Sequence, residues 1–141
     1  MNPEELAMVL AAKLAYEIDV TAAAALVVSE EMVLIDTRRE ASWGHGHIAG
    51  AIHLPVEKLL CGEDLELPEG KRLAVYGWGP GCNGATQAAL ILAQRGVAVQ
   101  EMIGGFEYWC RNGYPVVDAR GEWTPPADPQ VTASNAGPVR G

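Results

Sequence analysis

Basic residues are scarce in this chain. Its 141 residues include 10 Lys and Arg against 18 Asp and Glu, and the formal net charge is −8. Proteins that bind nucleic acid or anionic membranes concentrate positive charge on one surface. The bases here are scattered, so we expect neither nucleic acid nor a membrane as a partner. The acidic balance gives only a weak preference for basic partners.

Long apolar runs and paired cysteines are also lacking. No apolar run approaches the roughly 20 residues of a bilayer span. The first ten residues, MNPEELAMVL, carry acids where a secretory signal carries bases. Cys61, Cys82 and Cys110 are an odd number of cysteines without CxxC spacing, which disfavours a disulfide framework or a zinc site. We therefore expect a cytoplasmic protein with reduced thiols.

Hydrophobic residues nevertheless make up 49% of the chain, enough for the core of one domain. Short apolar runs alternate with helical patterns along most of the sequence. The expected strands cover residues 15–20, 32–36, 51–54, 73–76 and 97–102, and the expected helices cover 3–16, 22–29, 40–43, 57–60, 84–95 and 106–112. Such alternation predicts an α/β fold with a parallel sheet flanked by helices on both faces.

The same pattern divides the chain into three parts. We expect an N-terminal helical extension over residues 1–19 and an α/β domain over residues 20–120. From residue 121 onward the composition shifts to Pro, Gly, Ser, Asn and Thr. Such segments bury too little apolar surface to fold, so we predict a disordered tail over residues 121–141.

The most informative stretch is a glycine-rich loop between the apolar run 73–76 and the helical pattern that begins at Gly84. A loop that enters a helix N-terminus gathers unpaired amides and the positive end of the helix dipole. It therefore binds anions and stabilises a thiolate. Cys82 is the reactive side chain of this loop and our candidate catalytic residue. The other positions of the candidate active-site loop are Gly77, Trp78, Gly79, Pro80, Gly81, Asn83 and Gly84.

Four segments, in order, resemble the motifs of the rhodanese-like domain family. They are LIDTR at 34–38, GHIAGAIHLP at 46–55, the strand and loop at 73–84, and IGGFEYW with NGYPV within 103–116. The resemblance implies a single domain around a five-stranded parallel sheet. It also implies a sulfurtransferase without a cofactor. Active members of the family carry a persulfide on a loop cysteine and pass its sulfur from a donor such as thiosulfate to a thiophilic acceptor.

This sequence departs from the family at the catalytic position itself. The family's cysteine directly follows the position that matches Tyr76, and here that residue is Gly77. Glycine cannot act as a nucleophile. Three hypotheses follow: a sulfurtransferase that carries sulfur on Cys82, a catalytically inactive module that binds an anion or a partner, and a normal sulfurtransferase in which glycine replaces cysteine. A small sulfur donor or anion is the expected ligand, and a protein thiol is a candidate acceptor.

Asp36, Arg38 and His47 are our candidate supporting residues. Asp36 and Arg38 flank a strand end. In one interpretation they line the site; in the favoured one, Asp36 accepts backbone N–H groups and Arg38 pairs with a carboxylate. The resemblance gives His47 a place in a structural turn.

Two other kinds of site are disfavoured. His45, His47 and His53 are close in sequence, but a zinc site needs further ligands in tetrahedral geometry, so we predict no metal site. A related fold hydrolyses phosphate esters with a C-x5-R loop, in which arginine clamps the phosphoryl oxygens. No arginine follows Gly77 or Cys82 at that spacing, so the phosphatase pattern is absent.

Overall fold

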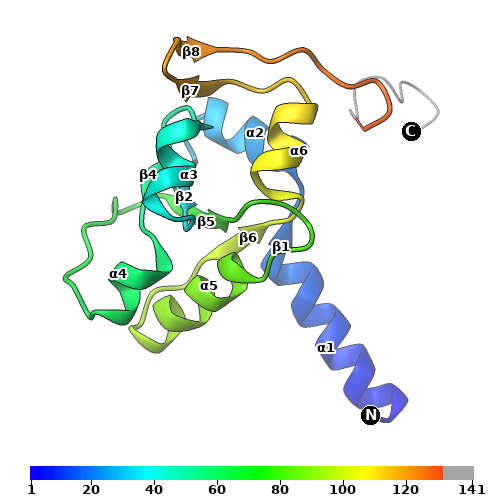
Figure 1. Ribbon diagram of the computed structural model, residues 1–141. Helices are drawn as coiled ribbons and strands as arrows, with labels where there is room; N and C mark the ends of the chain where they lie inside the picture. The colour runs from blue at the N-terminus through cyan, green and yellow to red at the C-terminus, as the bar shows by residue number, and fades with distance from the viewer. Residues whose placement is uncertain (132–141) are drawn as a thin grey trace.

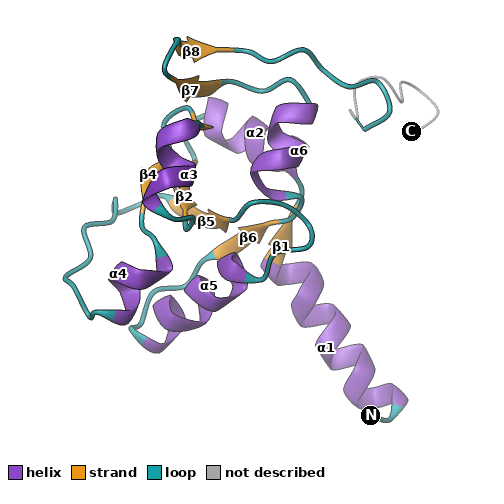
Figure 2. Ribbon diagram, viewed as in Figure 1, coloured by secondary structure: helices purple, strands orange, loops and turns teal. Residues whose placement is uncertain are grey.

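The computed structural model describes residues 1–131 (Figure 1). Helices and strands alternate as the sequence predicts, with ends shifted by a few residues (Figure 2). In chain order they are α1 (Pro3–Tyr16), β1 (Glu17–Ile18), α2 (Val20–Val28), β2 (Met32–Asp36), α3 (Glu40–His45), β3 (His47–Ile48), β4 (Ile52–His53), α4 (Val56–Leu60), β5 (Arg72–Tyr76), α5 (Gly84–Gln94), β6 (Gln100–Met102), α6 (Gly105–Arg111), β7 (Val116–Asp118) and β8 (Gly121–Trp123).

The main sheet has five strands in the order β1-β6-β5-β2-β4. Each neighbouring pair is parallel, so the predicted five-stranded parallel sheet is confirmed. In the register of β2 and β5, Asp36 lies beside Tyr76. Because parallel strands end at the same edge, this register brings the ends of β2 and β5 together where the glycine-rich loop begins.

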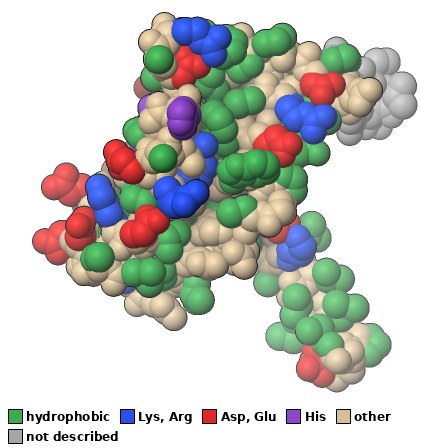
Figure 3. All heavy atoms as spheres, in the orientation of Figure 1, with side chains coloured by type: hydrophobic (Ala, Val, Ile, Leu, Met, Phe, Trp, Pro, Cys, Tyr) green, Lys and Arg blue, Asp and Glu red, His purple; other side chains and the backbone are tan. Residues whose placement is uncertain are grey.

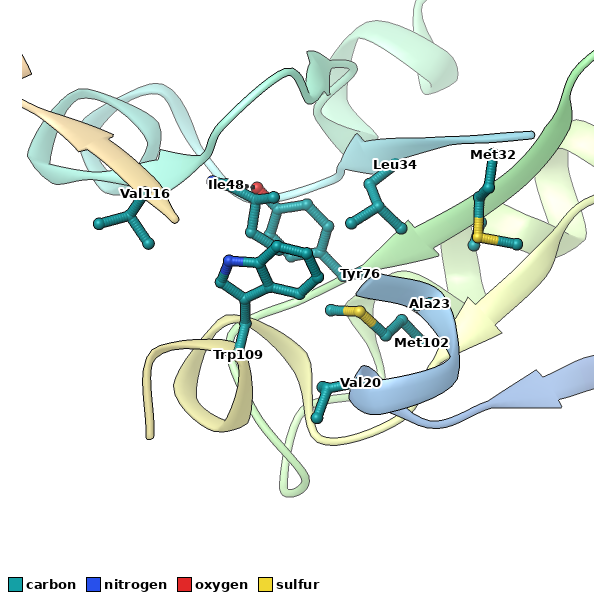
Figure 4. Close-up of a cluster of buried hydrophobic side chains, with 10 residues drawn as sticks. Val20, Ala23, Met32, Leu34, Ile48, Tyr76, Met102, Trp109 and Val116 are labelled. Carbon is teal, nitrogen blue, oxygen red and sulfur yellow. Dashed lines mark hydrogen bonds between the residues drawn. The ribbon is translucent and has the colours of Figure 1, made fainter. Parts of the chain in front are cut away.

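Both faces of the sheet are covered by helices. Leu34 packs on one face with α2 and with Trp109 of α6 (Figure 4). Its neighbour Ile35 points to the opposite face and packs with Leu59 of α4 and Leu92 of α5. Successive residues of a strand point to opposite faces, so a strand buried on both sides is an uninterrupted apolar run. That is why β2 and β5 are recognisable in the sequence.

A second sheet, β3-β7-β8, is antiparallel and was not expected. It corrects the prediction of a disordered tail, because residues 121–123 form β8 on the edge of β7. The indole of Trp123 donates a hydrogen bond to Asp118 (2.8 Å), and the Arg120 guanidinium lies 3.8 Å from the Trp123 ring centroid. Gly121, whose presence suggested disorder, instead permits the tight turn between β7 and β8. Residues 132–141, the last part of the predicted tail, lie outside the described residues.

The helix predicted over residues 3–16 is α1. Asn2 caps it by accepting a hydrogen bond from the Glu5 amide (2.8 Å), and Pro3 occupies its first turn. No residue of α1 is buried, and the helix projects away from the domain (Figure 1). Within residues 1–131, no helix combines the length and the hydropathy needed to cross a bilayer.

Candidate active site

The thiol of Cys82 lies at the N-terminus of α5. The Gly84 amide donates a hydrogen bond to Cys82 Sγ (3.4 Å), and the Cys82 amide donates to the Gly79 carbonyl (3.1 Å). Asn83, the N-cap residue, does not cap the helix; its side chain instead accepts a hydrogen bond from Gln87 (2.8 Å). The sulfur thus occupies the place of a capping oxygen, where a helix dipole favours negative charge. Cys82 is exposed, so a reactant can approach it.

The N-terminus of α6 holds the loop in place. The amides of Phe106 and Glu107 donate to the carbonyls of Gly77 (2.9 Å) and Trp78 (3.0 Å). This close approach requires glycine at position 105, which has φ of +61°; a Cβ there would lie 2.7 Å from the Gly77 carbonyl oxygen. The Gly104-Gly105 pair of the predicted motif therefore serves to seat α6 against the loop.

The end of β5 keeps room for a side chain. A Cβ added to Gly77 would lie 3.6 Å from Cys82 Sγ and 3.7 Å from both the Cβ and the amide nitrogen of Ala85, which are ordinary contact distances. Gly77 is also outside the left-handed region in which only glycine is relaxed. The site therefore retains a strand-end position that accepts a larger residue, and the Cys82 sulfur borders that space.

A cavity of about 280 Å³ opens beside Gly77 and Cys82. Its wall also includes Lys13 of α1, Glu17 of β1 and Glu101 of β6. Lys13 and Glu17 form an ion pair (2.6 Å), so Glu101 gives the wall an excess of negative charge. No motif in the sequence marks these three residues, because β1 and β6 pair only in the folded chain.

The Glu101 carboxylate is held by two hydroxyl groups. Tyr16 and Thr86 both donate to Glu101 Oε1, at 2.8 and 2.7 Å. Partial burial, together with the neighbouring Glu101 carboxylate, raises the pKa of Tyr16 well above its usual range. The phenol therefore keeps its proton and acts as a donor. The sequence signal for this group was the polar pair Gln100-Glu101 in the otherwise apolar predicted strand 97–102.

Asp36 and Arg38 make the contacts that the structural interpretation predicts. Asp36 accepts a hydrogen bond from the Arg38 amide (2.9 Å), and the carboxylate that pairs with the Arg38 guanidinium is Asp36 itself (2.7 Å). Tyr76 donates its hydroxyl to Asp36 (2.5 Å) and accepts the Ile48 amide (3.2 Å). Burial, more than the neighbouring carboxylate, raises the pKa of Tyr76 well above its usual range. This buried cluster fixes the ends of β2 and β5 beneath the loop.

The loop also borders a second hollow, of about 500 Å³, on the side of α3. Trp78, which is 59% exposed, lines it together with Arg38 and His45. The guanidinium of Arg38 lies 4.2 Å from the ring centroid of Phe106 in the same wall. Trp78 and Arg38 therefore flank a different space from the one that Cys82 borders.

His47 and His53 pack against the ring of Trp43. The rings of His47 and His53 stack on Trp43 with centroid distances of 3.5 and 4.6 Å. His47 Nδ1 is 3.0 Å from the Trp43 carbonyl, and His53 Nε2 is 2.8 Å from the Arg38 carbonyl. In the part of the chain that the structure describes, no group of three or more His, Cys, Asp or Glu side chains is placed to hold a metal ion.

Thiol alkylation should distinguish the three cysteines. Burial raises the pKa of Cys110 to about 11, whereas Cys61 and Cys82 are exposed. At about pH 8, roughly one Cys110 side chain in a thousand is a thiolate. We expect iodoacetamide to modify Cys61 and Cys82 and to spare Cys110, with Cys110 labelling rising about tenfold per pH unit up to about pH 11. Peptide mass spectrometry measures this, and equal labelling of all three at pH 8 would contradict it.

The fold and the site together define a class: a parallel α/β domain with a thiol-bearing glycine loop at the carboxyl edge of its sheet. A family model of the rhodanese-like domain matches residues 19–112, which is most of the chain. This chain belongs to the rhodanese-like domain family. A search of curated proteins found no match.

Solved structures agree with this assignment. A crystal structure of a Bacillus halodurans protein has 35% identity and a TM-score of 0.73, and the match covers 85% of this chain and 89% of the other. A full-length Lactobacillus plantarum protein has 28% identity and a TM-score of 0.68, with coverage of 82% and 98%. A rhodanese-related protein from Thermoplasma volcanium has 26% identity and a TM-score of 0.61, with coverage of 72% and 96%.

Proposed function

We propose that this protein is a sulfurtransferase that carries sulfane sulfur on Cys82. The observation that supports the proposal is the position of Cys82 Sγ, 3.6 Å from where the Cβ of a strand-end residue 77 would lie. The thiol of Cys82 therefore borders the space that a strand-end cysteine would use. The Gly84 amide, at the N-terminus of α5, donates a hydrogen bond to this sulfur (3.4 Å).

The reaction has two steps. The Cys82 thiolate attacks the outer sulfur of thiosulfate, an S–S bond forms to Cys82, and the S–S bond of the donor breaks to release sulfite. A thiophilic acceptor such as cyanide or a protein thiolate then attacks the terminal sulfur, and Cys82 leaves as a thiolate. The transferred sulfur keeps the same oxidation state in both steps, so the reaction needs no cofactor and no external oxidant. Cys82 must stay reduced between turnovers, which suits a cytoplasmic location.

Intact mass spectrometry after incubation with thiosulfate tests the proposal. We expect a gain in mass of one sulfur atom, loss of that gain when cyanide is added, and release of thiocyanate. Cys82→Ala should abolish both signals, because it removes the attacking sulfur. Cys61→Ala, which changes an exposed cysteine outside the site, should keep them. A gain of sulfur that survives in Cys82→Ala, or no gain in the unmodified protein, would reject the proposal.

The second candidate is a catalytically inactive binding module. Gly77 favours it, because the position that bears the family's nucleophile holds no side chain. Such a module would use the loop to bind an anion or a partner and would form no bond to sulfur. The same experiment separates the two: the inactive module gains no mass with thiosulfate.

A further inference from the structure

Helix α1 is apolar on nearly every side and yet touches little of its own domain. Its charged residues are Glu4, Glu5 and Lys13, and none of its 14 residues is buried. Figure 3 shows hydrophobic side chains over much of its visible surface. A helix that is hydrophobic all round is normally buried, and a 14-residue helix alone in water is marginal. The exposed surface of α1 therefore requires a cover.

The structure fixes the direction in which α1 leaves the domain. Tyr16 donates to Glu101 (2.8 Å), and the Gln100 amide group donates to the Ala15 carbonyl (3.4 Å). Lys13 is paired with Glu17 across the helix end (2.6 Å). The contacts of Tyr16 and Ala15 hold the last turn against β6, and the helix points outward (Figure 1). The cover must come from another molecule, because folding back onto the domain would break both contacts with β6.

The surface of α1 is complementary to itself. Side chains four residues apart form parallel rows along a helix. One row of α1 has large side chains, and the adjacent row has small ones. The large side chains are Leu6, Leu10 and Leu14, and the small ones are Ala7, Ala11 and Ala15. The ridge of leucines on one helix can enter the groove above the alanines of an identical helix, and a two-fold axis makes this contact twice.

We propose that a second copy of this chain covers α1, with the two α1 helices packed antiparallel around a two-fold axis near Leu10. Leu6 of each copy then lies near Leu14 of the other. The charges favour this direction: antiparallel helices keep the two acidic first turns, with Glu4 and Glu5, apart and bring opposite dipole ends together, while Lys13 stays paired with Glu17. Parallel helices would bring like charges together.

A membrane surface suits α1 less well. Helices that lie on anionic bilayers carry Lys and Arg on their polar face. Here the helix has two acidic residues and one basic residue, and the whole chain carries a net charge of −8. Electrostatic attraction to such a surface is absent, whereas a second copy matches the shape of the helix and, packed antiparallel, keeps the two acidic first turns apart.

The expected dimer is weak. A 14-residue helix is about 21 Å long, and two of them bury less than the roughly 1,600 Å² of a standard interface. We expect the full chain to be dimeric at high protein concentration and to dissociate on dilution, with a dissociation constant on the order of micromolar. Sedimentation velocity over a concentration series measures this.

Leu10→Lys should make the protein monomeric at every concentration tested, because it places two ammonium groups at the two-fold axis. The matched control is Leu90→Lys, which changes a leucine of α5 that is 59% exposed, and it should dimerise like the unmodified chain. Circular dichroism checks that both variants are folded. A protein that stays monomeric at the highest concentration overturns the proposal, as does a Leu10→Lys variant that is folded and still dimeric.

Cysteine cross-linking tests the antiparallel geometry in a chain that also carries Cys61→Ser and Cys82→Ser. Leu10→Cys should form a disulfide with its own copy under mild oxidation. Leu14→Cys alone should not, but mixed with Leu6→Cys it should form a cross-linked heterodimer. Efficient self-cross-linking of Leu14→Cys would indicate parallel helices and reject the arrangement. Sedimentation of the monomer with anionic vesicles would assign α1 to a membrane surface instead.

Discussion

Replacing Gly77 by cysteine is expected to raise the rate of sulfur transfer from thiosulfate to cyanide by about 100-fold. The variant places a nucleophile where an α5 amide can stabilise the charge on sulfur, and one preorganised donor contributes a factor of that order to catalysis. The new Cβ would make ordinary contacts, with Ala85 N at 3.7 Å and Cys82 Sγ at 3.6 Å. The new sulfur would stand at the strand end, next to the first amides of α5. Thiocyanate release at saturating thiosulfate measures the gain.

Two further variants make this result interpretable. Gly77→Ser adds a side chain of similar size without a sulfur nucleophile, so it should fold and show no gain. Gly77→Cys/Cys82→Ser removes the neighbouring thiol, which could otherwise form a disulfide with the introduced one. A folded, reduced Gly77→Cys protein that is no faster than the unmodified protein would show that the loop does not support a nucleophile at the strand end.

Asp36→Ala is expected to lower the free energy of unfolding by about 3–5 kcal/mol, the usual cost of removing one partner from a buried ion pair. The Asp36 side chain is fully buried, and the Arg38 side chain is only 8% exposed. The variant would leave the Arg38 guanidinium and the Tyr76 hydroxyl without their shared acceptor. Since small domains are stable by about 5–15 kcal/mol, the variant should be close to unfolding. Urea denaturation measures the change.

The matched control is Asp118→Ala, which breaks another Asp–Arg pair two residues apart. Its partner Arg120 is 67% exposed, so water replaces the lost contact and the effect should be much smaller. Combining Asp36→Ala with Arg38→Met should restore part of the stability, because the double variant no longer buries an unpaired charge. Equal losses in Asp36→Ala and Asp118→Ala would show that burial does not strengthen the first pair.

For Asp36 and Arg38, the sequence predicts the position and a structural role but not the contact between them. The sequence placed both residues at the end of a strand and favoured a structural role. It could not name the partner of Arg38, because an arginine can reach many carboxylates in an unfolded chain. Only the parallel register of β2 and β5 brings the Tyr76 hydroxyl onto Asp36 and completes the cluster.

The strand in the tail and the wall of the cavity beside Cys82 could not be predicted from the sequence. Composition predicted disorder from residue 121, but pairing with β7 made a strand of residues 121–123. Similarly, Lys13, Glu17 and Glu101 carried no recognisable motif, although the fold gathers them beside Cys82. Pairing between distant segments, such as β1 with β6, leaves little local trace, so spacing could not reveal the cavity wall. The β7–β8 hairpin is local, but its turn residues Ala119 and Arg120 lack the Asn-Gly or Asp-Gly signal of a tight hairpin.

The sequence alone determined the alternation of helices and strands, the parallel sheet and the glycine loop with Cys82. These follow from local patterns, because apolar period, glycine and capping residues act within a few positions of each other. The number of strands and the place of Gly77 at the usual nucleophile position came from the resemblance of its motifs to rhodanese-like domains. The tertiary structure decided that Gly105 lets α6 clamp the loop, that Glu101 and Lys13 face the cavity, and that α1 stands uncovered. Those features depend on which distant segments come into contact, and that is settled only when the whole core packs.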